Sequence, residues 1–280
     1  MPEGWQWDET LYLGSAPYYE QGRLPYAPGL ADRLAGVLGL DGRGRLIDVG
    51  CGPGILTLAL AHLFEEVVGV DPDQGMLEVA EDRAADMGIG NVQWLRARAE
   101  DLPAGLGTFR VATFAQSFHW MDRARVAAIM FTMLEPGGAF VHVSDVKEGE
   151  GTSIDGVPYP SPPHAEISSL VRKYLGPIRR AGQGMLRHGT PDGEARVLTA
   201  AGFDGPVRIL VPAGKILVRT ADAVVAWVYS RSDSAPHLFG DRLAQFEADL
   251  REVLHNVSPS GFFAERQPDT EVSVFHKPQR

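Results

Sequence analysis

The segment that most constrains the fold of this chain is an apolar run that ends in three alternating glycines, Leu46-Ile-Asp-Val-Gly-Cys-Gly-Pro-Gly54. Such a run predicts a buried strand, and glycines allow the backbone after it to adopt positive φ angles close to a ligand. Dinucleotide-binding turns have the spacing G-x-G-x-x-G, and P-loops end in Gly-Lys-Ser/Thr; this segment has neither. Asp48 precedes the first glycine by two positions, and an acid facing the turn suits a ligand with a free ammonium group better than one with two phosphates.

Short apolar runs alternate with helix-length segments from Arg45 to Asp145, which is typical of βαβ units and a parallel sheet. We predict strands at Leu46–Val49, Val67–Val70, Val92–Leu95, Arg110–Ala115, Ala139–Val143, Pro206–Val211 and Val272–Phe275. We predict helices at Ile55–Phe64, Gln74–Met87, Arg123–Leu134, Ile167–Tyr174, Val197–Ala201, Ala221–Tyr229 and Asp241–Leu254, and a turn at Leu134-Glu-Pro-Gly-Gly138. This order predicts an α/β fold, a doubly wound and mostly parallel seven-stranded sheet of Rossmann-like type with helical lid insertions.

The amino-acid composition limits which binding partners and which cellular compartment we expect. The formal net charge of −10 weighs against binding to phosphate backbones, so we expect no nucleic-acid partner. No stretch approaches the ~20 apolar residues of a membrane span, and the N-terminus lacks the features of a secretory signal. The single cysteine, Cys51, allows neither an intramolecular disulfide nor a Cys-rich metal site, so we expect a cytoplasmic protein without a bound metal. The oligomeric state stays open, a homodimer included.

The segment Asp48-Val-Gly-Cys-Gly-Pro-Gly54 resembles the first motif of the class I S-adenosylmethionine-dependent methyltransferases. The resemblance continues in order through Val68-Gly-Val-Asp71, Asp73-Gln-Gly-Met-Leu77, Arg98-Ala-Glu-Asp-Leu-Pro103, Ala115-Gln-Ser-Phe-His-Trp-Met-Asp122 and Leu134-Glu-Pro-Gly-Gly138. It covers about residues 40–145 and points to the small-molecule branch, similar to ubiquinone/menaquinone-biosynthesis or trans-aconitate methyltransferases. The cofactor implied is S-adenosyl-L-methionine, with S-adenosyl-L-homocysteine as the product.

The resemblance also implies which residues contact the cofactor. Asp71 would accept both ribose hydroxyls, Met76 would pack on the adenine, and Arg23 would face the methionine carboxylate with Tyr19 near the sulfonium. The acid at the adenine edge is either Glu100 or Asp101, and the sequence does not choose between them. The full expected set is Tyr19, Arg23, Asp48, Gly50, Cys51, Gly52, Gly54, Asp71, Pro72, Met76, Ala99, Glu100, Asp101, Gln116 and Ser117.

Methyl transfer is an in-line displacement at an activated carbon, so the enzyme must chiefly align the nucleophile and exclude water. If the acceptor is a hydroxyl or an acidic carbon, His119 is the best-placed base, although we favour a pocket-lining or structural role for it. We expect the substrate pocket to include Trp120, Tyr159, Arg180, His188 and Tyr229.

Four parts are expected along the chain: an N-terminal cofactor-covering helical element at 1–40, the cofactor-binding core at 41–146, a lid insertion at 147–193, and the remainder of the core at 194–280 with a second helical insertion at about 219–256. The two insertions should lie together over the substrate; alternatively they thicken the core or form a dimer contact. Gln116-Ser-Phe-His119 departs from the Asn/Asp-Pro-Pro-Tyr of nucleic-acid exocyclic-amine methyltransferases. The expected function is methyl transfer to O or C of a metabolite or natural-product intermediate; the alternative is an S-adenosylmethionine-binding enzyme that catalyses a non-methylating rearrangement or cyclisation.

Overall fold

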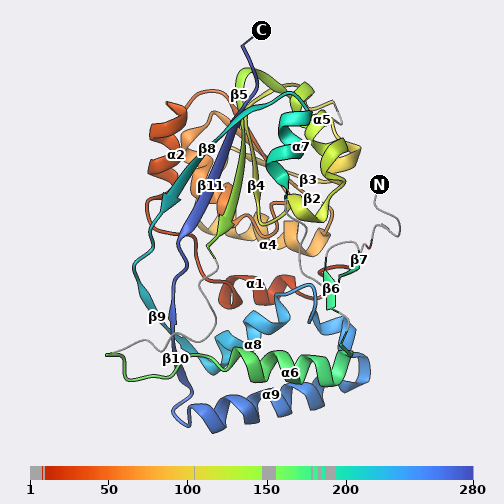
Figure 1. Ribbon diagram of the computed structural model, residues 1–280, viewed down its shortest axis with the longest axis vertical. Helices are drawn as coiled ribbons and strands as arrows, with labels where there is room; N and C mark the ends of the chain where they lie inside the picture. The colour runs from red at the N-terminus through yellow and green to blue at the C-terminus, as the bar shows by residue number, and fades with distance from the viewer. Residues whose placement is uncertain are drawn as a thin grey trace.

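The computed structural model describes residues 8, 10–103, 105–146, 156–177, 179–181, 184–186 and 193–279. Its centre is a seven-stranded sheet with the order β3-β2-β1-β4-β5-β11-β8 (Figure 1). The strands are β1 (Arg45–Val49), β2 (Glu66–Asp71), β3 (Val92–Arg96), β4 (Phe109–Ala115), β5 (Leu134–Asp145), β8 (Asp204–Val211) and β11 (Thr270–His276). The first five are parallel, and β11 runs antiparallel to both β5 and β8. The predicted doubly wound, mostly parallel sheet is confirmed.

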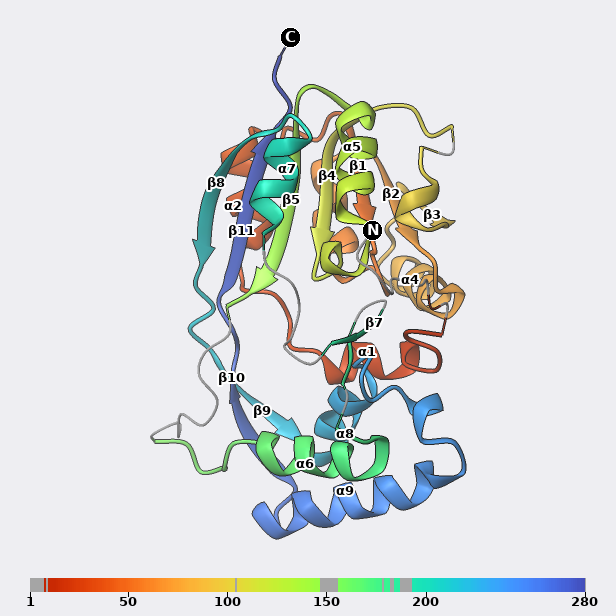
Figure 2. The same ribbon diagram turned by 45° about the vertical axis from the view of Figure 1, so that its right-hand side comes forward.

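Helices cover both faces of this sheet (Figures 1 and 2). Apolar side chains of α2 (Leu30–Leu38) and α3 (Ile55–Leu60) pack on one face. The other face is covered by α5 (Arg123–Met133) and α7 (Glu194–Ala200), while α4 (Gln74–Asp86) follows β2. Each predicted helix is present, with boundaries that differ by a few residues.

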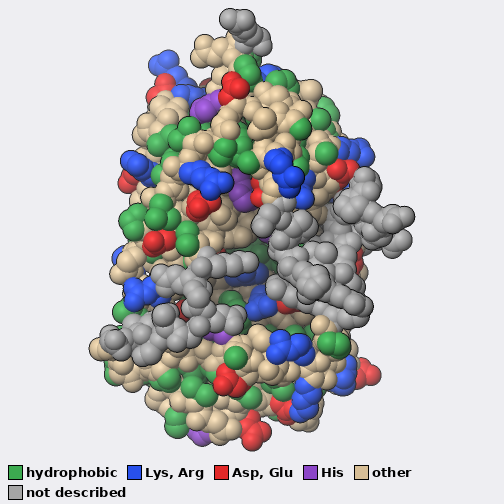
Figure 3. All heavy atoms as spheres, viewed as in Figure 1, with side chains coloured by type: hydrophobic (Ala, Val, Ile, Leu, Met, Phe, Trp, Pro, Cys, Tyr) green, Lys and Arg blue, Asp and Glu red, His purple; other side chains and the backbone are tan. Residues whose placement is uncertain are grey.

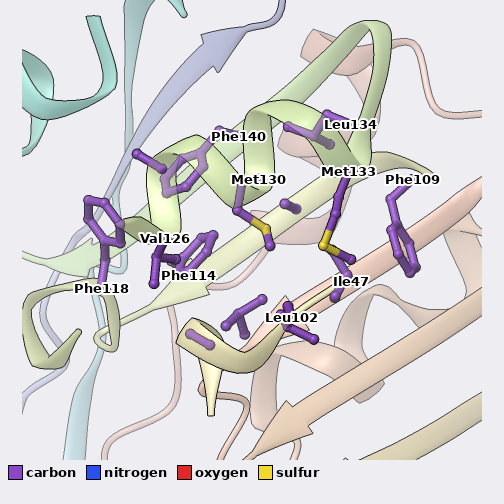
Figure 4. Close-up of a cluster of buried hydrophobic side chains, with 14 of the residues drawn as sticks. Ile47, Leu102, Phe109, Phe114, Phe118, Val126, Met130, Met133, Leu134 and Phe140 are labelled. Carbon is purple, nitrogen blue, oxygen red and sulfur yellow. The ribbon is translucent and has the colours of Figure 1, made fainter. Parts of the chain in front are cut away.

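Aromatic packing between the sheet and α5 supports the carboxyl end of β4 (Figure 4). The rings of Phe114 and Phe140 are stacked with centroids 4.4 Å apart, and Phe118 meets each of them edge-on at 5.2 Å. Phe118 lies in the short 3-10 helix η3 (Phe118–Trp120) immediately after β4. Its burial therefore fixes the segment that follows β4 against the core.

Two local features differ from the sequence prediction. The predicted turn at Leu134–Gly138 forms the start of β5, where the register with β4 jumps between Phe109↔Leu134 and Val111↔Ala139 and Gly137 has φ +78°. An antiparallel ribbon of β9 (Ile216–Thr220) and β10 (Phe262–Arg266) was not predicted. It continues the line of β8 and β11 away from the main sheet, as Figure 2 shows.

A second helical layer lies beyond the carboxyl edge of the sheet. It contains α6 (His164–Leu175), α8 (Ala221–Tyr229), the 3-10 segment η4 (Pro236–Arg242) and α9 (Leu243–Val257), with the short strands β6 (Arg179–Ala181) and β7 (Gly184–Leu186) nearby. Ile167 of α6 packs in one apolar cluster with residues of α8 and α9, including Phe246 and Leu250. The helices of the two predicted insertions therefore lie together.

Helix α1 (Ala16–Gly22) lies between the two layers and is fastened to the second (Figures 1 and 2). A Cβ at Gly22 would be 2.5 Å from the carbonyl carbon of Ala226, so glycine permits the close crossing of α1 and α8. The guanidinium of Arg219, which is 6% exposed, donates to the carbonyls of Gly22 (2.6 Å) and Ala223 (2.8 Å) and to the Glu265 carboxylate (2.8 Å). The position of α1 thus depends on the helical layer.

Replacement of Gly22 by alanine should lower the free energy of unfolding by about 1 to 3 kcal/mol, because the new methyl group overlaps the α8 backbone. The matched control is Gly36→Ala in the exposed interior of α2, where an added Cβ meets no atom within 4 Å. That change should raise the stability by about 0.5 to 1 kcal/mol through helix propensity. Urea unfolding measures both, and changes of the same sign would contradict the proposed α1–α8 contact.

Candidate functional site

A pocket of about 800 Å³, including its opening, lies between the carboxyl edge of the parallel strands and the N-terminal segment. The sheet side consists of the turn after β1 (Gly50 and Gly52), the end of β2 (Asp71) and the end of β4 (Gln116 and Ser117). The opposite side is formed by Leu11, Tyr12 and Tyr19. Ligands of doubly wound sheets bind at this edge, where the strand order reverses between β1 and β4.

Asp71 joins the ends of two strands at the pocket surface. One carboxylate oxygen accepts from the backbone N–H of Gly52 (2.8 Å) and the other from that of Asp73 (2.9 Å). Burial raises the pKa of Asp71 to about 6, while the two amide donors act in the opposite direction. Each oxygen retains lone-pair capacity, so the side chain can also accept hydrogen bonds from a ligand.

The glycines after β1 serve different purposes. Gly50 has φ +71°, and a Cβ there would lie 2.5 Å from the Cβ of Ser117, whose hydroxyl donates to the carbonyl of Val49 (2.6 Å). Gly52 has φ +53°, and an added Cβ would meet no protein atom within 4 Å. Gly50 therefore lets the two strand ends approach each other, and Gly52 leaves free space on the pocket side.

Three other predicted residues of this turn lie outside the pocket wall. Cys51 is buried, and burial raises the pKa of its thiol. Gly54 precedes α3 with φ +74° and packs beneath Trp94. The prediction that Asp48 faces the ligand is wrong, because its carboxylate is fully buried and accepts from the hydroxyls of Thr57 and Thr113.

Burial also raises the pKa of Asp48 to about 6, while the threonine hydroxyls act in the opposite direction. Thr57 lies on α3 and Thr113 on β4. Successive side chains of a strand point to opposite faces of the sheet. The Asp48 side chain points to the face that α3 covers, so it does not extend past the carboxyl edge. Its place is structural: it links β1, β4 and α3 beneath the glycine turn.

The structure distinguishes the two acids that the sequence left open. Glu100 lines the pocket and is 3% exposed, whereas Asp101 is exposed and lies outside the wall. One oxygen of Glu100 accepts from the N–H of Asp122 (2.8 Å), and the other lies 3.6 Å from the guanidinium of Arg98. Other predicted residues in this part of the wall are Pro72, Met76 and Ala99.

Gln116 has an unusual backbone at the pocket surface. Its φ of 56° is the single positive value for a non-glycine residue in the described part of the chain, and its N–H donates to Val143 (3.0 Å). Its side chain lies near Asp145 at the end of β5. Burial raises the pKa of Asp145, with Arg23 and Gln116 acting in the opposite direction. Such a backbone costs about 1 to 3 kcal/mol and is typical of functional sites.

Of the two residues predicted from the N-terminal element, Tyr19 lines the pocket and Arg23 lies behind it. The guanidinium of Arg23 is 4.9 Å from the centre of the Tyr19 ring and donates to the carbonyl of Ser230 (2.8 Å). Its Nε is buried without a hydrogen-bond partner among the residues described. This donor remains available to an anionic group.

The predicted substrate residues are only partly brought together. Trp120 lines the pocket, and its ring meets Tyr12 edge-on at 6.5 Å. The ring of His119 packs 4.2 Å from Trp120 but lies outside the pocket wall. Arg180 lies in β6, but its side chain is outside the described set, as is the whole of His188.

Two of the predicted substrate tyrosines lie outside the pocket wall. The placement of Tyr229 there is wrong: it is 1% exposed, packs among Phe239 and Phe246, and its hydroxyl donates to Glu247 (3.3 Å). The apolar faces of α8 and α9 enclose this ring in the core of the helical layer. The ring of Tyr159 contacts that of Phe262, with 5.4 Å between centroids.

Sequence reasoning missed several residues of the pocket wall, including Asp8, Leu11, Tyr12 and Arg98. The first three precede α1, in a segment without a strand or helix pattern. The sequence feature that could have indicated this part of the wall is the presence of two tyrosines, Tyr12 and Tyr19, in one short segment.

Two further features of the described residues bear on the class of site. No group of three or more His, Cys, Asp or Glu side chains among them is arranged to hold a metal ion. None of the described helices is long and apolar enough to cross a bilayer. Figure 3 shows Lys/Arg and Asp/Glu side chains interspersed on the viewed face.

Comparison with known proteins relates the core to one family. The sequence model of the methyltransferase domain family matches residues 46–138, which contain the glycine turn, Asp71 and Glu100. These residues are thus similar to a methyltransferase domain.

The sequence relatives that the domain resembles are also methyltransferases. An uncharacterized methyltransferase of Mycobacterium bovis is 37% identical over 132 residues, or 47% of this chain and 51% of the relative. A ubiquinone biosynthesis O-methyltransferase of Paracidovorax citrulli is 36% identical over 120 residues, covering 41% of this chain and 46% of the relative. The chain thus spans about half the length of the curated relatives it matches.

Solved structures show the same fold. A putative methyltransferase of Bacillus halodurans C-125 has a TM-score of 0.51 and 15% identity, covering 89% of this chain and 99% of that chain. The [4+2]-cyclase SpnF has a TM-score of 0.56 and 19% identity, covering 96% of this chain and 95% of its own. The Rossmann-like fold shared with these structures therefore extends beyond the matched domain.

The buried Asp48 carboxyl predicts a pH dependence of stability. Its folded pKa of about 6 lies above the unfolded value near 3.9, so its contribution is full below about pH 4 and is lost as the pH rises through 6. Asp48→Asn lacks this titration. The stability advantage of the native protein over the variant should therefore shrink by up to about 3 kcal/mol between pH 4 and pH 7.5. Denaturant unfolding across this range measures it; an advantage that is constant or grows would contradict the assignment.

Proposed function

We propose that this chain transfers a methyl group from S-adenosyl-L-methionine to a small molecule, at oxygen or carbon. The observation that carries the proposal is a methyltransferase domain whose pocket brings the open face of Gly52, the Asp71 carboxylate and Glu100 to one ligand-sized space. The ubiquinone biosynthesis O-methyltransferase and C-methyltransferase among the sequence relatives support an acceptor of metabolite size.

The pocket residues fit the proposed cofactor in polarity and shape. Asp71 would hold the ribose hydroxyls, Met76 would pack on the adenine, and Glu100 would accept from the exocyclic amine. The methionine portion would lie along Gly50, Gln116 and Ser117. When bound, S-adenosylmethionine supplies a methyl carbon activated by the adjacent positive sulfur.

The remaining pocket residues would orient the reactants and exclude water. The aromatic rings of Tyr12, Tyr19 and Trp120 would face the cationic sulfur and the acceptor. Arg23 lies behind Tyr19 rather than in the wall, and its positive charge would favour the methionine carboxylate from there. We assign His119 a packing role against Trp120, because its ring lies outside the pocket wall.

We assign a separate role to each successive part of the chain. Residues 1–40 cover the cofactor, 41–146 bind it, and the insertions at 147–193 and about 219–256 form the lid over the acceptor. The joint apolar cluster of α6, α8 and α9 supports a lid that acts as one body. The single cysteine fits a reducing, cytoplasmic compartment.

Asp71→Asn should weaken the binding of S-adenosylhomocysteine by about 1 to 3 kcal/mol, or roughly 5- to 150-fold, because the charged acceptor for the ribose hydroxyls is lost. Glu66→Gln is the matched control, since Glu66 begins the same strand and pairs with Arg45 (2.8 Å) outside the pocket. Titration calorimetry measures both affinities. Equal affinity of Asp71→Asn and the native protein would show that Asp71 does not hold the ribose.

The methyl transfer itself is tested with S-adenosylmethionine labelled in the methyl group and a panel of phenols, hydroxyquinones and hydroxy acids. We expect the label in one class of acceptor together with an equal amount of S-adenosylhomocysteine. A product that forms without label, while the cofactor remains intact, would contradict methyl transfer in favour of a rearrangement or cyclisation.

A further inference from the structure

Segments that cross between the sheet and the helical layer are tied together near the start of β11. The side-chain amide of Gln267, which is 2% exposed, donates to the carbonyl of Tyr26 (2.9 Å), and its backbone N–H donates to that of Lys215 (2.9 Å). The carbonyl of Asp269 accepts from the backbone N–H of Val146 (2.8 Å). We call residues 26, 146, 215 and 267–269 the crossing segments. Their hydrogen bonds keep the two layers joined on this side of the molecule.

Helix α1 also contacts the sheet domain, through α4. The Glu20 carboxylate and the Arg83 guanidinium form an ion pair at 3.1 Å. The Arg83 side chain is 21% exposed and its Nε is buried without a hydrogen-bond partner among the residues described, so Glu20 offsets a largely desolvated charge. One turn earlier on α1, the Cβ of Ala16 lies 3.7 Å from the position that a Cβ on Gly75 would occupy. We call these two approaches the α1–α4 contact.

The strand order places the pocket between these two attachments. Strands β11 and β8 form one end of the sheet, whereas α4 connects β2 to β3 at the other end. The pocket lies between them, with Met76 of α4 and Tyr19 of α1 in its wall. Because Gly22 and Arg219 fasten α1 to the helical layer, α1 moves with that layer. A separation of the layers about the crossing segments would therefore part α1 from α4, which lie next to each other in Figure 2.

We infer that the helical layer and α1 open and close over the pocket about the crossing segments, and that the Glu20–Arg83 ion pair holds them closed. Glu20 and Arg83 lie outside the pocket wall, so they are positioning residues that set how fast a ligand enters and leaves. The inference rests on the proposed function, because it takes the ligand of this pocket to be S-adenosylmethionine or its product.

Glu20→Gln should speed both association and dissociation of S-adenosylhomocysteine about two- to five-fold, the effect of losing one partly exposed ion pair. Both rates should rise because the free and the bound protein lose the same contact, so Kd should stay within about two-fold. Asp222→Asn is the matched control, since Asp222 is similarly exposed and pairs with Arg251 (2.7 Å) within the helical layer. It should leave both rates unchanged, and the charge exchange Glu20→Arg/Arg83→Glu should restore the native rates.

Stopped-flow fluorescence measures these rates. Equal rates in the native protein and Glu20→Gln would overturn the inference. So would a faster dissociation with an equal loss of affinity, because that result describes a damaged pocket rather than an easier opening.

The double variant Ala16→Cys/Gly75→Cys tests the motion itself, because a separation of 3.7 Å suits the two Cβ atoms of a disulfide. The oxidised variant should exchange S-adenosylhomocysteine about ten-fold more slowly than the reduced variant, since a covalent bond then holds α1 on α4. Equal exchange in the two forms would show that the pocket does not open at the α1–α4 contact.

Thiol labelling without any ligand separates this inference from the proposed function. The thiol of Gly75→Cys is next to Ala16 and becomes more accessible when α1 leaves α4. Its labelling, followed on the peptide that contains residue 75, should be faster when Glu20→Gln is added and unchanged when Asp222→Asn is added. Equal labelling with and without Glu20→Gln would overturn the inference. A native protein that fails to bind S-adenosylhomocysteine, while Glu20→Gln still speeds labelling, would refute the cofactor assignment and support the opening.

Discussion

The hydrogen bonds accepted by the Asp71 carboxylate are the interaction on which the sheet side of the site depends. They join the glycine turn after β1 to the start of α4, across the register that places Val49 beside Val70. The cost is a buried acid with a raised pKa. A carboxylate held by two backbone amides has a fixed direction, and Gly52 leaves the space before it open. The geometry that a ribose would need is therefore built into the backbone.

The other side of the pocket has a different physical origin. It depends on the attachment of α1 to the helical layer. Gly22 has no side chain and therefore lets α1 cross close to α8, and Arg219 donates hydrogen bonds to backbone carbonyls of both helices. The loop after α8 also contributes, because the carbonyl of Ser230 accepts from the guanidinium of Arg23 (2.8 Å). The pocket consequently lies between the carboxyl edge of the sheet and a wall whose position is set by segments distant in sequence. A change in the helical layer can alter the site without touching the matched domain.

The sequence predicted those features that depend on short-range pattern. Strands β1 to β5 and the glycine turn follow from apolar runs and glycine spacing, so they were correct. The assignment of Asp71 came from the family resemblance, and this residue lies in the pocket wall. The direction of Asp48 and the burial of Tyr229 depend on which helix packs above each residue, and these predictions were wrong. Tyr12 was missed because it precedes α1 in a segment whose place against the sheet edge does not follow from a strand or helix pattern. The choice between the two adjacent acids at the adenine edge likewise required the fold.

The most direct test of the central claim is a crystal structure of the protein with S-adenosylhomocysteine. The account predicts electron density for the ligand between Gly52 and Tyr12, with both ribose hydroxyls within hydrogen-bond distance of the Asp71 carboxylate and the adenine between Met76 and Glu100. A ligand bound elsewhere, or bound in this pocket with its ribose away from Asp71, would contradict it.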